Sequence, residues 1–234
     1  MEGIERRVSH ARLGKSSHRA LIGRMAIGVA HEIRNPLTVI KGYLQLQEKR
    51  AACCTNESLG IIFQELHQIE VLVTNIISLA ENKAIKKKPE NLNQILERIY
   101  PVVQSAAVKS GIMTELRLAD NLPMLNLHAE EIEQMVLILA RNGIEAMQVS
   151  GSLRIGTIRK SGSVVLYVKD EGSGIPPEQR GEIFDPFYST KAGNAGLGLA
   201  ISLNIVERHQ GEIEVDSTLG VGSVFKVLFP IGKQ

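Results

Sequence analysis

His31 is the side chain of this sequence best suited to nucleophilic chemistry. It lies within an apolar helical pattern. Because each helical residue turns by about 100°, it points about 200° away from Val29 and Ile33 on the apolar stripe. The imidazole is therefore expected in solvent, where a pKa of about 6.5 leaves its neutral, nucleophilic form dominant at pH 7. The carboxylate of Glu32 could hold one ring nitrogen while the other attacks. The competing interpretation is an ordinary surface histidine.

The same exposed side of this helix carries further groups of interest. Asn35 and Ile27 lie one turn from His31, and Thr38 follows Asn35 by one turn. Pro36 adds a backbone defect that can bend the helix beside the histidine. Ile27 is a candidate contact for a docking partner, although single exposed apolar residues are common on protein surfaces.

Two long helical patterns position this face and predict a dimer. The apolar positions of the first are Ile22, Met25, Val29, Ile33, Leu37, Ile40 and Leu44, and those of the second, which form a heptad seam, are Leu59, Ile62, Leu66, Ile69, Val73, Ile76 and Ala80. A short polar turn joins them, with Thr55 or Asn56 as the helix cap. Because one hairpin has little to bury its stripes against, two copies should form a four-helix bundle, a homodimer through residues 18–84.

A second domain follows a linker. The basic run from Lys86 to Pro89 ends in proline, which breaks a helix, so we expect a hairpin over 1–85, a linker over 86–90 and a domain over 91–234. In that domain helical patterns cover 93–111, 129–147 and 197–210, with a kink or break at Pro101, and strand patterns cover 112–118, 152–160, 163–170, 212–217 and 223–230. This mixture predicts an α/β sandwich with helices on one face of a mixed sheet.

Composition excludes several classes of protein. The formal net charge of +2 is too weak to indicate a nucleic acid or an acidic membrane surface as partner. The sequence has neither an apolar run of about 18 residues nor a signal peptide. Cys53 and Cys54 are adjacent in the sequence. This spacing suits two reduced thiols better than a disulfide-bonded fold or a zinc site. These features predict a cytoplasmic chain.

Five ordered motifs resemble those of bacterial sensor histidine kinases. The segment HEIRNPLTVIKGYLQL, which begins with His31, resembles that family's phosphoacceptor box, and ARNGIEAM, DEGSGIP, FDPFYSTK and GLGLA resemble the boxes of its ATP-binding domain. One glycine motif is weak evidence, but five in the expected order are specific. HEIRNPLT looks most like the sporulation kinases of bacilli. The resemblance implies an α plus α/β fold, a dimeric four-helix bundle of helical hairpins followed by an α/β sandwich that binds ATP and Mg²⁺.

The resemblance also implies roles for single residues. Asn142 resembles the Mg²⁺-binding asparagine, a neutral oxygen ligand whose coordination phosphates and water complete. Asp170 resembles the carboxylate that accepts a hydrogen bond from the adenine amino group, and Gly172 and Gly174 would let the backbone approach the base. The further nucleotide-binding residues that the resemblance implies are Arg141, Phe187, Lys191, Gly196, Leu197 and Gly198.

These further residues divide by chemistry. Phe187, together with Phe184, would anchor a mobile lid over the nucleotide. The glycines of GLGLA would open a helix whose free N–H groups face the phosphates, and Arg141 and Lys191 would neutralise phosphate charge. Taken one at a time, turn glycines, core phenylalanines and surface charges are equally good explanations.

Two positions depart from the family pattern. Ile138 stands where the family usually has another asparagine, four residues before Asn142, and this change puts metal binding in doubt. Asn194 stands where the second glycine box usually opens with glycine, and Gly193 is displaced by one position. The conformation of the lid is therefore in doubt, although Gly196 and Gly198 remain.

The mechanism that the resemblance implies is a two-step phosphoryl transfer. His31 attacks the γ-phosphate of ATP in line, while Glu32 orients the imidazole and takes up its proton. The phosphoryl group then passes to an aspartate of a response-regulator receiver domain, and Asn35 would position water for hydrolysis of that aspartyl phosphate. Protein inhibitors that bind the helical bundle are further expected partners. Family members usually carry a sensor domain or a membrane anchor upstream, which we also expect of the full-length protein.

Two other functions remain open at this point. The first is an ATP hydrolase or ATP-driven clamp of the same nucleotide-binding fold. Those enzymes have a glutamate four residues before the metal-binding asparagine, and Ile138 cannot act as that base. The second is a dimeric interaction module in which the nucleotide is only a structural ligand.

Overall fold

The structure is a computed structural model that describes residues 29, 32–46, 56–80, 85–147, 150–190 and 195–231. These residues divide into two compact units. One contains the described residues of 83–185 and 198–234, and the other contains those of 13–82 together with 186–197. No helix among the described residues is long and apolar enough to cross a membrane.

The helical unit contains the two helices that the sequence predicts. Residues 32–46 are helical, and α2 covers Asn56–Ala80. The first helix continues through Pro36, whose side chain is buried. His31, Ile27, Thr55 and both cysteines lie outside the described residues, so the predictions about them stay predictions.

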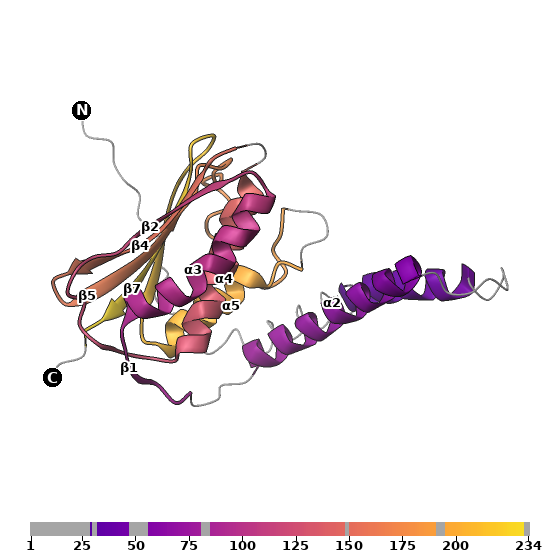
Figure 1. Cartoon of the computed structure of the whole chain (residues 1–234), viewed down its shortest axis with the longest axis horizontal. Coiled ribbons are helices and arrows are strands. Elements are labelled where there is room, and N and C mark those ends of the chain that lie inside the picture. The colour runs from indigo at the N-terminus through magenta and orange to yellow at the C-terminus, as the bar shows by residue number, and fades with distance from the viewer. Residues whose placement is uncertain are drawn as a thin grey trace. The chain divides into compact units, whose positions relative to one another are not determined.

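The second unit is built on a five-stranded sheet in the order β2-β4-β5-β7-β6 (Figure 1). The strands are β2 (Met113–Arg117), β4 (Ser152–Lys160), β5 (Ser163–Lys169), β7 (Gly222–Pro230) and β6 (Glu212–Thr218). β2 is parallel to β4, and every other neighbouring pair is antiparallel. The predicted mixed sheet is therefore confirmed, and β4–β5 and β6–β7 are antiparallel hairpins.

Three helices cover one face of this sheet (Figure 1). They are α3 (Leu92–Lys109), α4 (Ala129–Ala146) and α5 (Gly198–Arg208). β5 is the central strand, and its run of Val164, Val165 and Leu166 is buried to 1% exposure or less. α4 contributes an apolar stripe that includes Ile132, Met135 and Val136, which are fully buried. The predicted α/β sandwich is thus confirmed, with an aliphatic core.

Part of the segment predicted as a linker, residues 86–90, is a strand. β1 (Lys88–Glu90) pairs in antiparallel register with β3 (Leu125–Leu127) and adds a small second sheet. Pro89 lies opposite Asn126. Proline fits a position that donates no ladder hydrogen bond, and Lys88 and Glu90 on either side can then make the bonds to β3.

Pro101 neither breaks α3 nor ends it. The helix runs on to Lys109, although a proline removes one backbone hydrogen bond. Leu96 and Val103, on either side of the proline, are both buried. Their tertiary packing holds the helix together where local propensity alone would end it.

Candidate functional site

The C-terminal half of α4 brings several predicted site residues together. Asn142 lies one turn beyond Ile138 on the same side of the helix, and Gly143 lies next to it. A Cβ on Gly143 would meet the Cβ of Asp170 at 3.2 Å, and a Cβ on Gly198 would meet Ile138 Cγ2 at 3.0 Å. α4 therefore presents one face to Asp170 and another to the first residue of α5.

Asp170 is a buried carboxylate that the backbone holds in one orientation. It follows β5 and is 3% exposed. Its Oδ1 accepts hydrogen bonds from the N–H of Gly172 at 2.9 Å and the N–H of Ser223 at 3.2 Å. A buried carboxyl oxygen that accepts from two backbone donors is held in a fixed position.

Gly172 and Gly174 lie in close contact with other parts of the protein, and their predicted role at the base stays a prediction. A Cβ on Gly172 would meet the Cβ of Ala146 at 2.7 Å, and a Cβ on Gly174 would collide with the carbonyl oxygen of Thr218. Gly174 also has a φ of +72°. In this structure these glycines let the loop after Asp170 approach α4 and β6, so their absent side chains serve protein packing.

The C-terminal hairpin anchors the same loop through contacts that the sequence analysis did not predict. Ser217 Oγ accepts a hydrogen bond from the N–H of Ile175 at 2.7 Å and lies 2.9 Å from Ser223 Oγ. Arg180 donates to the carbonyl of Ser217 at 2.5 Å. Because these partners lie about 40 residues from the loop, no local motif could have identified them.

The segment before GLGLA is a loop whose two ends are joined by a backbone hydrogen bond. The N–H of Phe187 donates to the carbonyl of Gly196 at 2.9 Å, and both residues have a positive φ, +68° and +64°. Phe184 and Leu197 are buried, with 6% and 2% exposure. Lys191 and Asn194, between these ends, lie outside the described residues. α5 itself begins at Gly198, so Gly196 precedes the helix.

The polar groups of α4 fit a cation and phosphates. The side chain of Asn142 makes no hydrogen bond with any described residue, so its amide oxygen is available as a neutral ligand for Mg²⁺. The side chain of Arg141 is 75% exposed and donates to Glu145 at 2.7 Å, one turn along the helix. This exposed pair is weak, so Arg141 can exchange the carboxylate for a phosphate at little cost.

The described part of the first helix carries two predicted site residues. Glu32 is half-buried and Asn35 is exposed. Thr38 is also exposed, but its hydroxyl donates to the carbonyl of Arg34 at 2.8 Å. Asn35 and Thr38 therefore lie on an accessible surface of the helix.

Two family matches cover most of the chain. Residues 22–85 match the His Kinase A (phospho-acceptor) domain, and residues 128–233 match the histidine kinase-, DNA gyrase B- and HSP90-like ATPase. The chain belongs to the histidine kinase family. Its order of domains, a helical phospho-acceptor region before a mixed α/β ATPase-type domain, is that of a histidine kinase catalytic core.

Individual relatives agree with this assignment. The chain is 36% identical to sporulation kinase C of Bacillus subtilis (strain 168), over 94% of this chain and 52% of the relative. It is 32% identical to the signal transduction histidine-protein kinase AtoS of Escherichia coli (strain K12), over 98% of this chain and 38% of the relative. The chain thus spans about half the length of these histidine kinases, or less.

A solved structure shares the fold over both parts. The histidine kinase ThkA, in complex with response regulator protein TrrA, superposes with a TM-score of 0.73 at 28% identity. The match covers 92% of this chain and 63% of ThkA. It therefore includes residues of the helical unit as well as the sheet.

Proposed function

We propose that this chain is an ATP-dependent protein-histidine kinase that phosphorylates its own His31 and passes the phosphoryl group to an aspartate of a receiver domain. The observation that carries the proposal is the gathering of Asn142, Asp170 and the start of α5 around one end of α4, in a member of the histidine kinase family. Sporulation kinase C is about twice as long as this chain, so the activity of the whole protein is also proposed here.

Each group at this site has a separate task. Asp170 accepts a hydrogen bond from the adenine amino group, and its rigid backbone contacts fix the position of the base. Asn142 contributes an oxygen ligand to Mg²⁺, which supplies positive charge to the phosphates. Arg141 and Lys191 add cationic side chains, and the loop between Phe187 and Gly196 acts as a lid.

The acceptor belongs to the helical unit. His31 attacks phosphorus with its neutral ring nitrogen, and the adjacent Glu32 holds the other nitrogen and stabilises the developing positive charge. The bond to the leaving oxygen of ADP breaks as the bond to nitrogen forms. We assign this role to the hairpin of residues 1–85 and nucleotide binding to residues 91–234.

The helical unit dimerises in this proposal. Five seam residues, Leu37, Leu44, Leu59, Leu66 and Val73, are 37–51% exposed in the single chain. Large apolar side chains repeating at this spacing indicate an interface, because a second hairpin would remove them from water. A four-helix bundle through residues 18–84 satisfies this requirement.

The receiving partner is a response-regulator receiver domain. ThkA, which is similar to this chain, was solved with the response regulator TrrA. The exposed side of the first helix, with Asn35 and Thr38, is the surface we assign to receiver docking, and protein inhibitors of the bundle would compete for it.

Labelling with γ-labelled ATP tests the proposal. Wild type should acquire acid-labile, alkali-stable label, His31→Gln should acquire none while still binding ATP, and His67→Gln should label normally. His67 is a matched control because its side chain is 76% exposed on α2. Label retained by His31→Gln would overturn the assignment of the acceptor.

The same experiment separates kinase from hydrolase. Ile138 points a methyl group at the start of α5, and no carboxylate stands at that position to activate water. Release of inorganic phosphate in the absence of a receiver, without labelled protein, would favour the hydrolase instead.

A further inference from the structure

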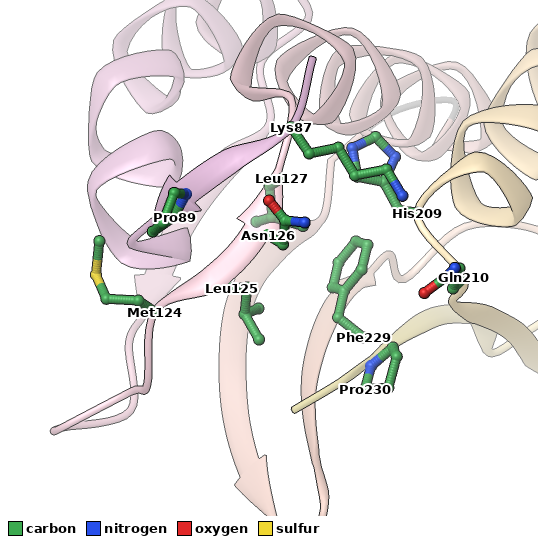
Figure 2. A pocket seen from close by; sticks show the side chains of 10 residues that line it. All are labelled: Lys87, Pro89, Met124, Leu125, Asn126, Leu127, His209, Gln210, Phe229 and Pro230. Atoms are coloured by element: carbon green, nitrogen blue, oxygen red, sulfur yellow. The ribbon is translucent and has the colours of Figure 1, made fainter. Parts of the chain in front are cut away.

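A cavity of about 490 Å³ lies beside the small sheet of β1 and β3 (Figure 2). Strand β3, the turn after α5 and the end of β7 also line it. Its floor is formed by Leu125, Leu127, His209 and Phe229, whose exposure is only 1–4%. The edge of the His209 ring meets Phe229 at a centroid distance of 6.2 Å. The floor is therefore apolar, partly aromatic and well ordered by the surrounding core.

This cavity is separate from the proposed nucleotide site. His209 follows the C-terminal end of α5, whereas Gly198 begins the helix at the nucleotide site. At 1.5 Å per residue the two lie roughly 15 Å apart along the helix. A ligand in the cavity and a nucleotide beside Asn142 would thus not share side chains.

Three polar side chains line the cavity: Lys87 is half-buried, and Asn126 and Gln210 are exposed. Lys87, Asn126 and Gln210 make no side-chain hydrogen bond or ion pair with any residue that the structure describes. Figure 2 shows Phe229 between Asn126 on β3 and Gln210 in the turn after α5. None of the ten described lining residues is acidic, so Lys87 gives the wall of the cavity a positive charge, although Lys87 also interacts electrostatically with Glu131, which does not line the cavity.

His209 does not compete for a ligand's polar groups. Its Nδ1 lies 2.7 Å from the carbonyl of Ile205, and its Nε2 accepts from the N–H of His128 at 3.0 Å. Both ring nitrogens are occupied within the protein, so the ring offers only its apolar surface to the cavity.

Gln210 is held in a strained backbone conformation at this cavity. Its φ is +57°, in the left-handed region that favours glycine at the end of a helix. A glycine there would remove the strain and also remove the amide that lines the cavity. This conformation ends α5, since the N–H of Gly211 donates to the carbonyl of Val206 at 2.9 Å.

We propose that this cavity binds a small aromatic monocarboxylate. The carboxylate pairs with Lys87 and accepts hydrogen bonds from the amides of Asn126 and Gln210, while the rings cover Phe229 and the leucines of β3. One lysine with two neutral amides matches a single negative charge. A phosphate, with about two charges, would need further cations, and the apolar floor would then have no partner.

Fluorescence anisotropy of naphthoate with the full chain tests this proposal, because the protein contains no tryptophan to interfere. For a ligand of about 13 heavy atoms we expect saturable binding with a Kd of about 1 mM or tighter. Lys87→Gln should weaken binding by about fivefold or more, and the neutral analogue naphthylmethanol should bind more weakly than naphthoate by a similar factor. Lys86→Gln is the matched control, since Lys86 is exposed, adjacent in sequence and outside the cavity, and it should leave the affinity within about twofold.

Gln210→Gly provides a second, independent arm. It should raise the melting temperature of the ligand-free protein by relieving strain, and it should weaken naphthoate binding by removing an amide. Absence of saturable binding, equal effects of the two lysine variants, or unchanged affinity in Gln210→Gly would each overturn the proposal. Displacement of naphthoate by excess ATP would also overturn it, because the ligand would then occupy the nucleotide site.

Discussion

Titration of His209 should make this fold lose stability below pH 6.5. The residue is 4% exposed, and burial lowers the pKa of its imidazole from 6.5 to about 4. The carbonyl of Ile205 opposes this change by accepting a hydrogen bond from Nδ1. The positive charges of Lys87 and Arg208 add to the lowering. The folded protein therefore keeps a neutral imidazole where the unfolded chain would protonate it.

The hydrogen bonds of His209 explain why protonation is costly. The N–H of His128, at the N-terminal cap of α4, donates to Nε2, so Nε2 must carry a lone pair. A proton on Nε2 would put two N–H groups face to face and break the link between the end of α5 and the start of α4. Protonation is thus tied to the packing of two core helices.

The size and sign of the effect follow from proton linkage. Between the folded pKa of about 4 and the unfolded value of 6.5, the unfolded state binds more protons, so the free energy of unfolding falls as pH falls. At about 1.4 kcal/mol per pH unit, the loss from pH 7.5 to pH 5 is about 2 kcal/mol. Burial raises the pKa of Glu131, whose Oε2 lies 3.8 Å from His209 Nδ1, and this acts in the opposite direction. The figure of about 2 kcal/mol is therefore an upper bound.

Urea unfolding followed by circular dichroism measures this effect. Wild type should lose up to about 2 kcal/mol between pH 7.5 and pH 5 relative to His209→Gln, which keeps an acceptor near His128 but does not titrate. His67→Gln, at an exposed histidine of α2, should keep the wild-type pH dependence. An identical pH dependence in wild type and His209→Gln would refute the reasoning.

Three further predictions concern the proposed function. Asp170→Asn should weaken ATP binding by about tenfold or more in equilibrium titration, because an amide replaces the charged acceptor; unchanged affinity would place the base elsewhere. Glutamate at both Leu66 and Val73 should convert the dimer to a monomer in sedimentation, since the dimer interface would bury unpaired charge. A wild-type chain that is monomeric at micromolar concentration would contradict dimerisation through the heptad seam. Asn35→Ala should slow dephosphorylation of the receiver while labelling of His31 persists, whereas a parallel fall in both activities and in melting temperature would indicate a structural role.

The sequence predicted the elements that have strong periodicity. The hairpin of β4 and β5 turns at Ser161 and Gly162, where the φ of +83° at Gly162 explains the glycine. The strands β1 and β3 were missed because three residues are too few to show alternation, and because Pro89 is unusual within a strand. Pro101 was expected to disturb α3, but buried neighbours on both sides override the local preference.

The candidate site was predictable only where its residues are close in sequence. The motif around Asp170 could be found by inspection, but its contacts to the far end of the chain could not. Ser223 lies 53 positions away, and its N–H donates to Asp170 Oδ1. In the same way, the carbonyl of Ser173 accepts from the N–H of Gly220 at 2.7 Å, which ties the loop to the β6–β7 turn. Non-local pairings of this kind depend on the fold and leave no short-range pattern.

These contacts give the C-terminal hairpin a part in positioning Asp170 and the loop after it, although the hairpin carries none of the five motifs. Ser223 of β7 is one of the two backbone donors that orient Asp170 Oδ1, and β7 is held by seven register pairs with β5. The loop after Asp170 is similarly fixed on one side by Ala146 of α4 and on the other by Thr218 of β6. Asp170, which we propose as the base-binding group, is thus positioned by the last two strands as much as by the motif in which it stands.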